Sequence, residues 1–164
     1  MAQPRSELVG ANDETVRLES AAVETRLRVD PEAARTTMRS PGVQGEAAAA
    51  DVEPDRVFLN LENVHGVNDA AVIYVYISHP AASLAEELVG AVSLFGARKA
   101  SALDSPRGGN GINESLEITE WVDRLRAAGV QDLDDLKVRL VPRTQIRPED
   151  DISIGRISVY RQGR

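Results

Sequence analysis

Two stretches near the C-terminus, LKVRLVPR (residues 136–143) and ISIGRISVYR (residues 152–161), alternate apolar and polar residues with a period of two. In the first stretch, Val138 and Leu140 alternate with basic residues. Such alternation places one side of a strand in a core and the other side in water. The connecting segment TQIRPEDD contains a proline and three acids, which is typical of a surface turn. The pattern predicts the last two strands of an antiparallel β-sandwich.

Upstream segments have the same strand character. The run from 71 to 80 is rich in β-branched and aromatic residues, and Pro80 closes it. Residues 119–129 instead place Val122 and Leu125 three apart, between an expected N-cap at Thr119 and an expected C-cap at Gly129, which predicts a short amphipathic helix. The expected fold is mainly β, a jelly-roll-like antiparallel β-sandwich with one short α-helix. Its expected strands are 56–66, 71–80, 88–96, 115–119, 136–143 and 152–161, and its expected core includes Leu59, Leu61, Val138, Leu140 and Ile154.

The N-terminal third differs in composition. All six aromatic residues lie between Arg56 and Arg161, which places the expected core in that part of the chain. Residues 15–20 and 23–29 alternate and predict two strands that pack on the sandwich edge or on a partner. Proline, glycine and a run of alanines after residue 30 are typical of a linker. The expected organisation is N-terminal strands within residues 1–30, a linker over residues 31–55 and the sandwich over residues 56–164.

In this order, the segments resemble the C-terminal domain of tyrosinases and polyphenol oxidases, the type-3 copper oxidases. The similar motifs are VFLNLENV with the following Gly66, IYVYIS, GAVSLFG, LEITEWVDRL, LKVRLVPR and ISIGRISVYR. Their shared order along about the last two thirds of the chain carries the resemblance. SELVGAN (residues 6–12) is also similar to the stretch that joins the copper domain to this module in bacterial relatives.

The resemblance implies an accessory role beside an oxidase. It implies a non-catalytic domain that packs on a tyrosinase-like copper domain, in cis or in trans, stabilises it and shields its phenol-binding cleft. In such families a side chain of this module can occupy the substrate position. If Leu94 faces the core, alternation directs Phe95 outward as the candidate plug, whereas burial of Phe95 in the core is the alternative. The expected shielding or partner contacts are Phe95, Arg98, Arg107, Gly108, Gly109 and Asn110.

The histidine count bears on copper chemistry. Type-3 centres hold two coppers with three imidazoles each, and imidazole nitrogen suits copper. This chain has only His65, before a turn glycine, and His79, before a proline, and both are expected to be exposed. We therefore expect no catalytic residue, no metal ligand and no cofactor in this chain, which is not an enzyme on its own. The resembled oxidase partner would carry the two coppers.

Other functions remain open at this stage. The acidic turns Asp132, Asp134, Asp135 and Glu149, Asp150, Asp151 offer the oxygen ligands that calcium prefers, although their spacing matches no EF-hand. An independent calcium-binding or carbohydrate-binding sandwich, or a homo-oligomeric structural protein, is the alternative function.

Charge and composition restrict partners and location. The net charge of −7 argues against nucleic-acid and anionic-membrane surfaces. The chain has no cysteine, no long apolar run and no signal-peptide pattern, so the expected location is cytoplasmic. Arginine predominates over lysine and alanine is abundant, which fits a GC-rich bacterial source.

Overall fold

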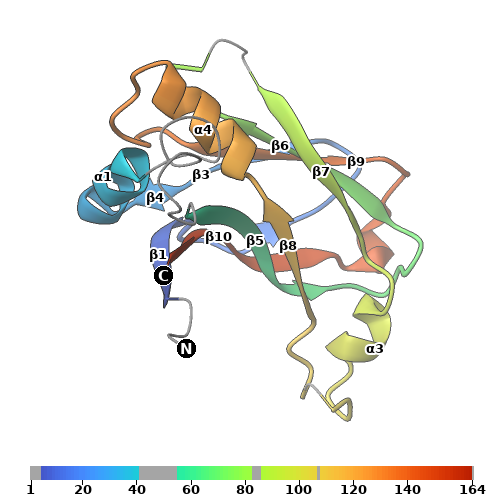
Figure 1. The fold of residues 1–164 in the computed structure, drawn as a ribbon. Helices are drawn as coiled ribbons and strands as arrows, with labels where there is room; N and C mark the ends of the chain where they lie inside the picture. Colours follow the sequence, from blue (N-terminus) through green and yellow to red (C-terminus); the bar gives the residue numbers. More distant parts are fainter. Residues whose placement is uncertain (1–4, 41–54, 83–85, 107, 164) are drawn as a thin grey trace.

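The computed structural model describes residues 5–40, 55–82, 86–106 and 108–163. Two antiparallel sheets pack face to face (Figure 1). Sheet A has the strand order β4-β1-β10-β5-β8, with β2 also paired to β10, and sheet B has the order β3-β9-β6-β7. The mainly β fold expected from the alternating segments is therefore confirmed.

The elements have the following bounds. Sheet A contains β1 (Arg5–Ala11), β2 (Val16–Arg17), β4 (Arg28–Val29), β5 (Arg56–His65), β8 (Ile112–Glu117) and β10 (Ser153–Gly163). Sheet B contains β3 (Val23–Arg26), β6 (Val72–Ser78), β7 (Glu87–Ser93) and β9 (Lys137–Pro142). The helices are α1 (Pro31–Arg39), α3 (Ala97–Ser101) and α4 (Thr119–Ala127), with a 3₁₀ turn at Pro148–Asp150. Only α4 was expected from the sequence.

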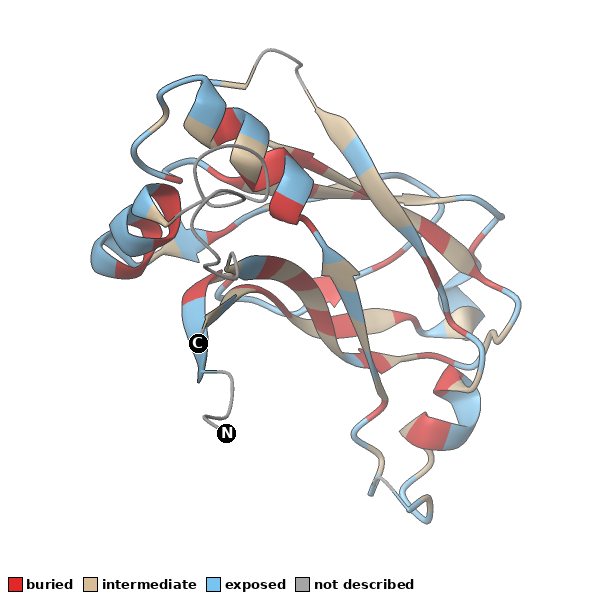
Figure 2. Cartoon of the chain, in the orientation of Figure 1, coloured by how far each residue is buried: buried red, intermediate tan, exposed pale blue. Residues whose placement is uncertain are grey.

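An aliphatic core lies between the sheets. Figure 2 shows that buried residues recur along the strands of both sheets. In sheet A, Leu59 pairs with Val159 and Leu61 with Ile157, and all four side chains are buried. The five core residues expected from the alternation are confirmed as fully buried: Leu59, Leu61, Val138, Leu140 and Ile154. Each large aliphatic side chain buried in this way contributes about 1.5–3 kcal/mol of apolar burial.

The expected location of the core between Arg56 and Arg161 is confirmed for most of its residues, with N-terminal residues added to it, but the aromatic residues themselves contribute little to it. Only Trp121 among them is buried. Tyr74 and Tyr76 alternate with the fully buried Ile73, Val75 and Ile77 and therefore point to the outer side of sheet B. In sheet A, two aromatic side chains form an outward-pointing pair across the strands β10 and β5, namely Tyr160 and Phe58.

The N-terminal segment joins both sheets. Strands β1 and β2 pair with β10 of sheet A, whereas β3 pairs with β9 of sheet B. Val9 in β1, Leu18 after β2 and Leu27 between β3 and β4 are buried in the shared core. These N-terminal strands contain no aromatic residues, and they bury their apolar side chains in the core of the sandwich.

Helix α1 replaces the first part of the expected linker. Asp30 caps it, because its Oδ1 accepts a hydrogen bond from the Ala33 backbone N–H at 2.8 Å. Pro31 occupies the first turn, where its missing N–H costs nothing. Asp30 followed by Pro31 was the local sequence signal for this helix. The proline and glycine content of residues 31–55 favoured a linker instead. The rest of the expected linker, residues 41–54, lies outside the described residues.

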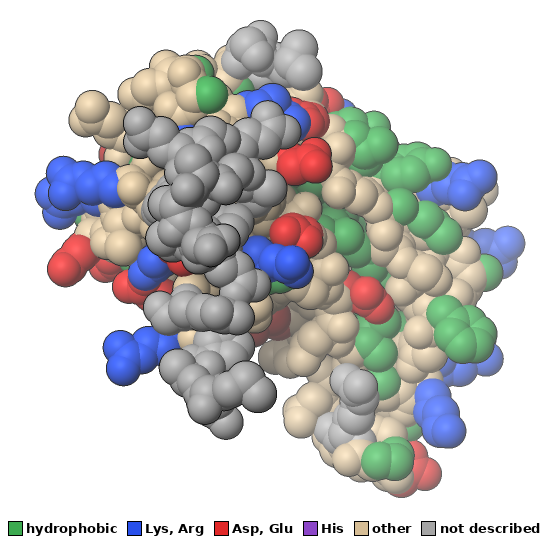
Figure 3. All heavy atoms as spheres, in the orientation of Figure 1, with side chains coloured by type: hydrophobic (Ala, Val, Ile, Leu, Met, Phe, Trp, Pro, Cys, Tyr) green, Lys and Arg blue, Asp and Glu red, His purple; other side chains and the backbone are tan. Residues whose placement is uncertain are grey.

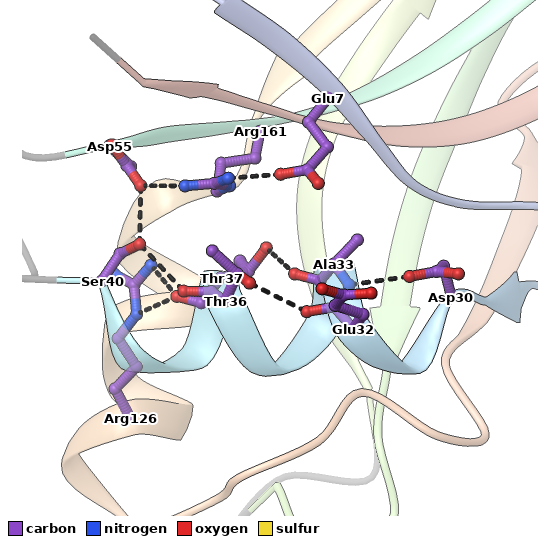
Figure 4. Close-up of polar contacts among 10 residues, drawn as sticks. All are labelled: Glu7, Asp30, Glu32, Ala33, Thr36, Thr37, Ser40, Asp55, Arg126 and Arg161. Atoms are coloured by element: carbon purple, nitrogen blue, oxygen red, sulfur yellow. Dashed lines mark hydrogen bonds and ion pairs between the residues drawn. The ribbon is translucent and has the colours of Figure 1, made fainter.

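Polar contacts hold α1 against the sandwich and against α4 (Figure 4). Arg126 of α4 donates from Nε and Nη2 to the Thr37 carbonyl oxygen at 3.0 and 2.7 Å. Ser40, directly after α1, donates to Asp55 at 2.6 Å, and Asp55 also accepts from Arg161 of β10 at 2.7 Å. The Arg126 bonds give the Thr37 carbonyl additional donors near the C-terminal end of α1, where carbonyls lack partners in a following turn, and the Asp55 bonds link this end to β10.

Helix α4 begins and ends differently from the expectation. Thr119 is its first residue and not its N-cap, which is Ile118. The Thr119 hydroxyl instead accepts a hydrogen bond from the Val57 backbone N–H at 3.0 Å, so it fixes α4 to β5. The C-cap is Ala128, and Gly129 follows it with a φ of 80°, a conformation that glycine adopts without strain.

Candidate functional site

Strand β7 directs Phe95 into solvent. The preceding residue, Leu94, is fully buried, and its backbone N–H donates to the Ala71 carbonyl at 3.0 Å. Because successive side chains of an extended chain point to opposite sides, Phe95 faces outward and is 82% exposed. The outward orientation expected from the sequence is confirmed, and the alternative of a core Phe95 is wrong.

Helix α3 places Arg98 beside the turn between β5 and β6. The Arg98 guanidinium donates from Nε and Nη2 to the Val67 carbonyl oxygen at 3.0 and 2.8 Å. Its backbone N–H donates to Asp69 Oδ1 at 3.1 Å. Arg98 is exposed to solvent, but these bonds fix its position, so it stiffens the chain directly after Phe95.

The glycine-rich loop follows α3 and is anchored at its end. Gly108 and Asn110 are exposed, whereas Gly109 is half-buried and its carbonyl lies 2.6 Å from His65 Nε2. Gly111 is buried with a φ of 75°, and a Cβ there would collide with the Val64 carbonyl. A glycine is therefore required where the loop enters β8. Arg107, the remaining expected contact, lies outside the described residues.

Two exposed apolar residues at this end were not expected. Leu103 is 89% exposed and lies after α3, and a side chain built on Gly109 would meet it. Val67 is also exposed, and its carbonyl is the acceptor for Arg98. A single apolar residue in a polar loop has no periodic signal, so sequence reasoning had no means to identify either.

A polar hollow of about 320 Å³ lies next to Arg98. Hydrogen bonds from the Arg147 backbone and from the Asn68 side chain lower the pKa of Asp150, which lines the hollow, below its usual range. Its other lining residues are Val67, Asn68, Arg98, Gln145 and Arg147. Since polar side chains and backbone dominate this lining, it does not suit a phenol ring.

The two histidines lie apart and in different surroundings. The expected exposure of His79 is wrong, because its side chain is buried and its Nδ1 accepts from the Ala81 backbone N–H at 3.1 Å. Its Nε2 lies 3.8 Å from Asp132 Oδ1. His65 is half-buried, with its ring nitrogens 2.9 and 2.6 Å from two backbone carbonyls. Neither arrangement gathers further imidazoles.

The acidic turns use their carboxylates locally. Asp132 accepts from the Asp134 backbone N–H at 3.1 Å, and Asp135 pairs with Arg26 at 3.4 Å. Asp151 pairs with Arg17 at 2.5 Å. Within residues 5–40, 55–82, 86–106 and 108–163, no group of three or more His, Asp or Glu side chains is arranged to hold a metal ion. In the same part of the chain, no helix has the length and apolarity to cross a membrane.

Comparison with known proteins places the chain in a family. The family described as "Domain of unknown function (DUF7868)" matches residues 5–162. The chain belongs to this family. A tyrosinase of Hahella sp. (strain CCB-MM4) is 28% identical over 115 residues, which cover 69% of this chain and 25% of the tyrosinase. The relation to tyrosinases expected from the strand motifs is therefore confirmed, and the chain spans about a quarter of that relative's length.

Solved structures with a similar outline include two forms of a latent aurone synthase (polyphenol oxidase). The recombinantly expressed form gives a TM-score of 0.45 at 13% identity, over 87% of this chain and 25% of that chain. The form from natural source gives 0.44 at 13% identity, over 88% of this chain and 24% of that chain. A structure of infectious bursal disease virus, Gx strain, gives 0.33 at 10% identity, over 98% of this chain and 32% of that chain.

Proposed function

We propose that this chain is a non-catalytic accessory domain that packs on a tyrosinase-like dicopper oxidase domain, in cis or in trans, and shields its phenol-binding cleft. The observation that carries the proposal is the 82% exposure of Phe95 in a chain related to a tyrosinase. A phenyl ring has the shape of the ring that a phenol-binding cleft receives, and aromatic rings pack favourably on one another. The two coppers and the chemistry belong to the oxidase domain.

The surroundings of Phe95 suit such a role. Phe95 follows a paired strand, and Arg98 is tied to the Val67 carbonyl, so the ring projects from a stiff base. A side chain that is already ordered before docking loses less conformational entropy on binding. The loop with Gly108, Gly109 and Asn110 flanks the same end and would contact the rim of the cleft.

A chimera tests the proposal. Residues 5–163 replace the related quarter of the Hahella tyrosinase, and oxidation of an o-diphenol is measured with and without Phe95→Ala. Removal of a ring that contributes about 1.5–3 kcal/mol of burial should raise turnover at least about tenfold, because the cleft becomes accessible. The melting temperature should stay the same, since Phe95 makes no core contact.

Leu103→Ala is the matched control, because Leu103 is similarly exposed and lies at the same end of the domain, on the other side of α3. It should leave turnover unchanged. Equal turnover of the parent chimera and the Phe95→Ala chimera would show that Phe95 does not shield the cleft.

A further inference from the structure

The outer side of sheet B presents apolar side chains from three neighbouring strands, β7, β6 and β9, with polar residues beside them. Tyr74 pairs with Ala91 on one side and with Val141 on the other, and Tyr76 pairs with Leu88. Paired residues share a face of the sheet, so these side chains lie together on the outer side. The sheet B outer face comprises Val72, Tyr74, Tyr76, Leu88, Ala91, Ser93 and Val141, and Phe95 lies at its end, in the turn after β7.

This surface is open, although β6 has the composition of a strand that is covered on both sides. The inward residues Ile73, Val75 and Ile77 are fully buried, and the outward ones are also aromatic or β-branched. Near-continuous apolar strands normally have both faces covered. Here Leu88 is 49% exposed and Phe95 is 82% exposed. Figure 3 shows hydrophobic side chains gathered over β7, with Lys and Arg side chains along the same edge.

The charged residues around this face are mostly cations, whereas the chain as a whole has a negative net charge. Lys137 and Arg139 alternate with inward residues of β9, Arg143 directly follows β9, and Arg26 of β3 pairs with Lys137. The carboxylates that pair with these cations are Glu24, Glu86 and Asp135, so the four cations exceed them by one on a chain with a net charge of −7, and Arg143 pairs with none of the three. Arg139 donates from Nε to Glu86 at 2.7 Å, and its guanidinium lies 4.9 Å from the centre of the Tyr76 ring.

We propose that the sheet B outer face is the surface on which a partner protein docks, and that the docked surface is apolar at its centre and acidic at its rim. This inference rests on the proposed function, because it names the tyrosinase-like domain as the partner. The related tyrosinase has about three quarters of its length beyond the matched part, which supplies a domain large enough to cover a whole sheet. A second copy is a poorer occupant, since facing copies would bring their cations together.

Thiol labelling tests the inference, because the chain has no cysteine of its own. Ala91→Cys places a thiol on the sheet B outer face, and Ser115→Cys places an equally exposed thiol on β8 of sheet A as the control. Each is introduced into the isolated chain and into the tyrosinase chimera, and maleimide modification is measured at that position by peptide mass spectrometry. Docking in cis benefits from a high effective concentration, so Ala91→Cys should react at least about tenfold more slowly in the chimera. Ser115→Cys should react at the same rate in both.

A charge reversal tests the acidic rim. Arg143→Glu in the Ala91→Cys chimera should reduce the protection of the thiol at least about threefold, because a rim charge then faces carboxylates. Arg56→Glu, on the exposed start of β5 in sheet A, is its control and should change nothing.

The outcomes separate this inference from the proposed function. Equal labelling of Ala91→Cys in both proteins would overturn the docking surface, and the accessory function would still stand if Phe95→Ala raises turnover. If Ala91→Cys is labelled slowly in the isolated chain, and more slowly as the protein concentration rises, a second copy covers the face. That result would also overturn the inference.

Discussion

The outer faces of the two sheets differ in the side chains that they present to solvent. On sheet A, Glu62 accepts from Arg156 at 2.5 Å and from Ser158 at 2.9 Å, and Arg156 also donates to the Tyr160 hydroxyl at 2.9 Å. On sheet B, half-buried tyrosines lie beside the exposed Leu88, and the cations on this side exceed the carboxylates by one. The first face satisfies its polar groups within the chain. The second leaves apolar area exposed, which on soluble proteins usually marks a partner site.

The largest expected change in unfolding free energy comes from a substitution on the inner side of sheet B. Leu140 lies in the core directly below the open face and is fully buried. Leu140→Ala should lower the free energy of unfolding by about 2–5 kcal/mol, through lost burial and a residual cavity. Urea melts of the isolated chain measure this change. A loss below about 1 kcal/mol would mean that the inner side of sheet B is not a tightly packed core.

A smaller effect is expected on the outer face of sheet A. Glu62→Gln removes the carboxylate that accepts from Arg156 and Ser158. Since the ion pair is partly exposed, the expected loss of unfolding free energy is about 1 kcal/mol. Ser115→Ala, on the same face, is the control and should change stability less. Equal melts for Glu62→Gln and the parent chain would show that the network is not what stabilises this face.

Acid should weaken the same network. The hydrogen bond from Arg156 lowers the pKa of Glu62 below its ordinary value of 4.5. A carboxylate with a lowered pKa in the folded state contributes stability above the unfolded pKa and loses it as pH falls through the folded pKa. The parent chain should therefore lose stability below about pH 4.5 more steeply than Glu62→Gln. Parallel stability curves for the two proteins between neutral pH and pH 3 would contradict this assignment.

The smallest effect is expected on the open face. Tyr74→Ser should change the stability of the isolated chain by no more than about 0.5–1 kcal/mol, because Tyr74 is only half-buried and lies outside the core cluster. In the chimera the same change should also weaken docking, measured as faster labelling of Ala91→Cys. If Tyr74→Ser unfolds the isolated chain, sheet B uses Tyr74 for its own stability and the contrast between the faces fails.

Alternation predicted the strands of the sandwich well because their inner residues are aliphatic and regularly spaced. It did not predict the placement of the aromatic residues. In IYVYIS both sides of the strand are apolar, so a period of two cannot tell which side is buried. Helix α1 was missed because composition over a wide window outweighed the cap formed by Asp30 and Pro31.

The candidate site was predictable only where it follows a strand. Phe95 continues the alternation of β7, so its orientation followed from the burial of Leu94. Arg98 is held by a carbonyl 31 residues away in sequence, and no local pattern indicates such a contact. The exposure of Leu103 and the burial of His79 likewise depend on how loops fold against the sheets.

Controlled removal of this chain tests the central claim most directly. A protease site placed at the junction of the chimera allows the accessory domain to be cleaved off, and o-diphenol oxidation is measured before cleavage and immediately after separation of the two parts. If the domain shields the copper cleft, turnover should rise on its removal, and adding the isolated domain back should lower it again. Turnover that is unchanged by removal and by re-addition would contradict a shielding role.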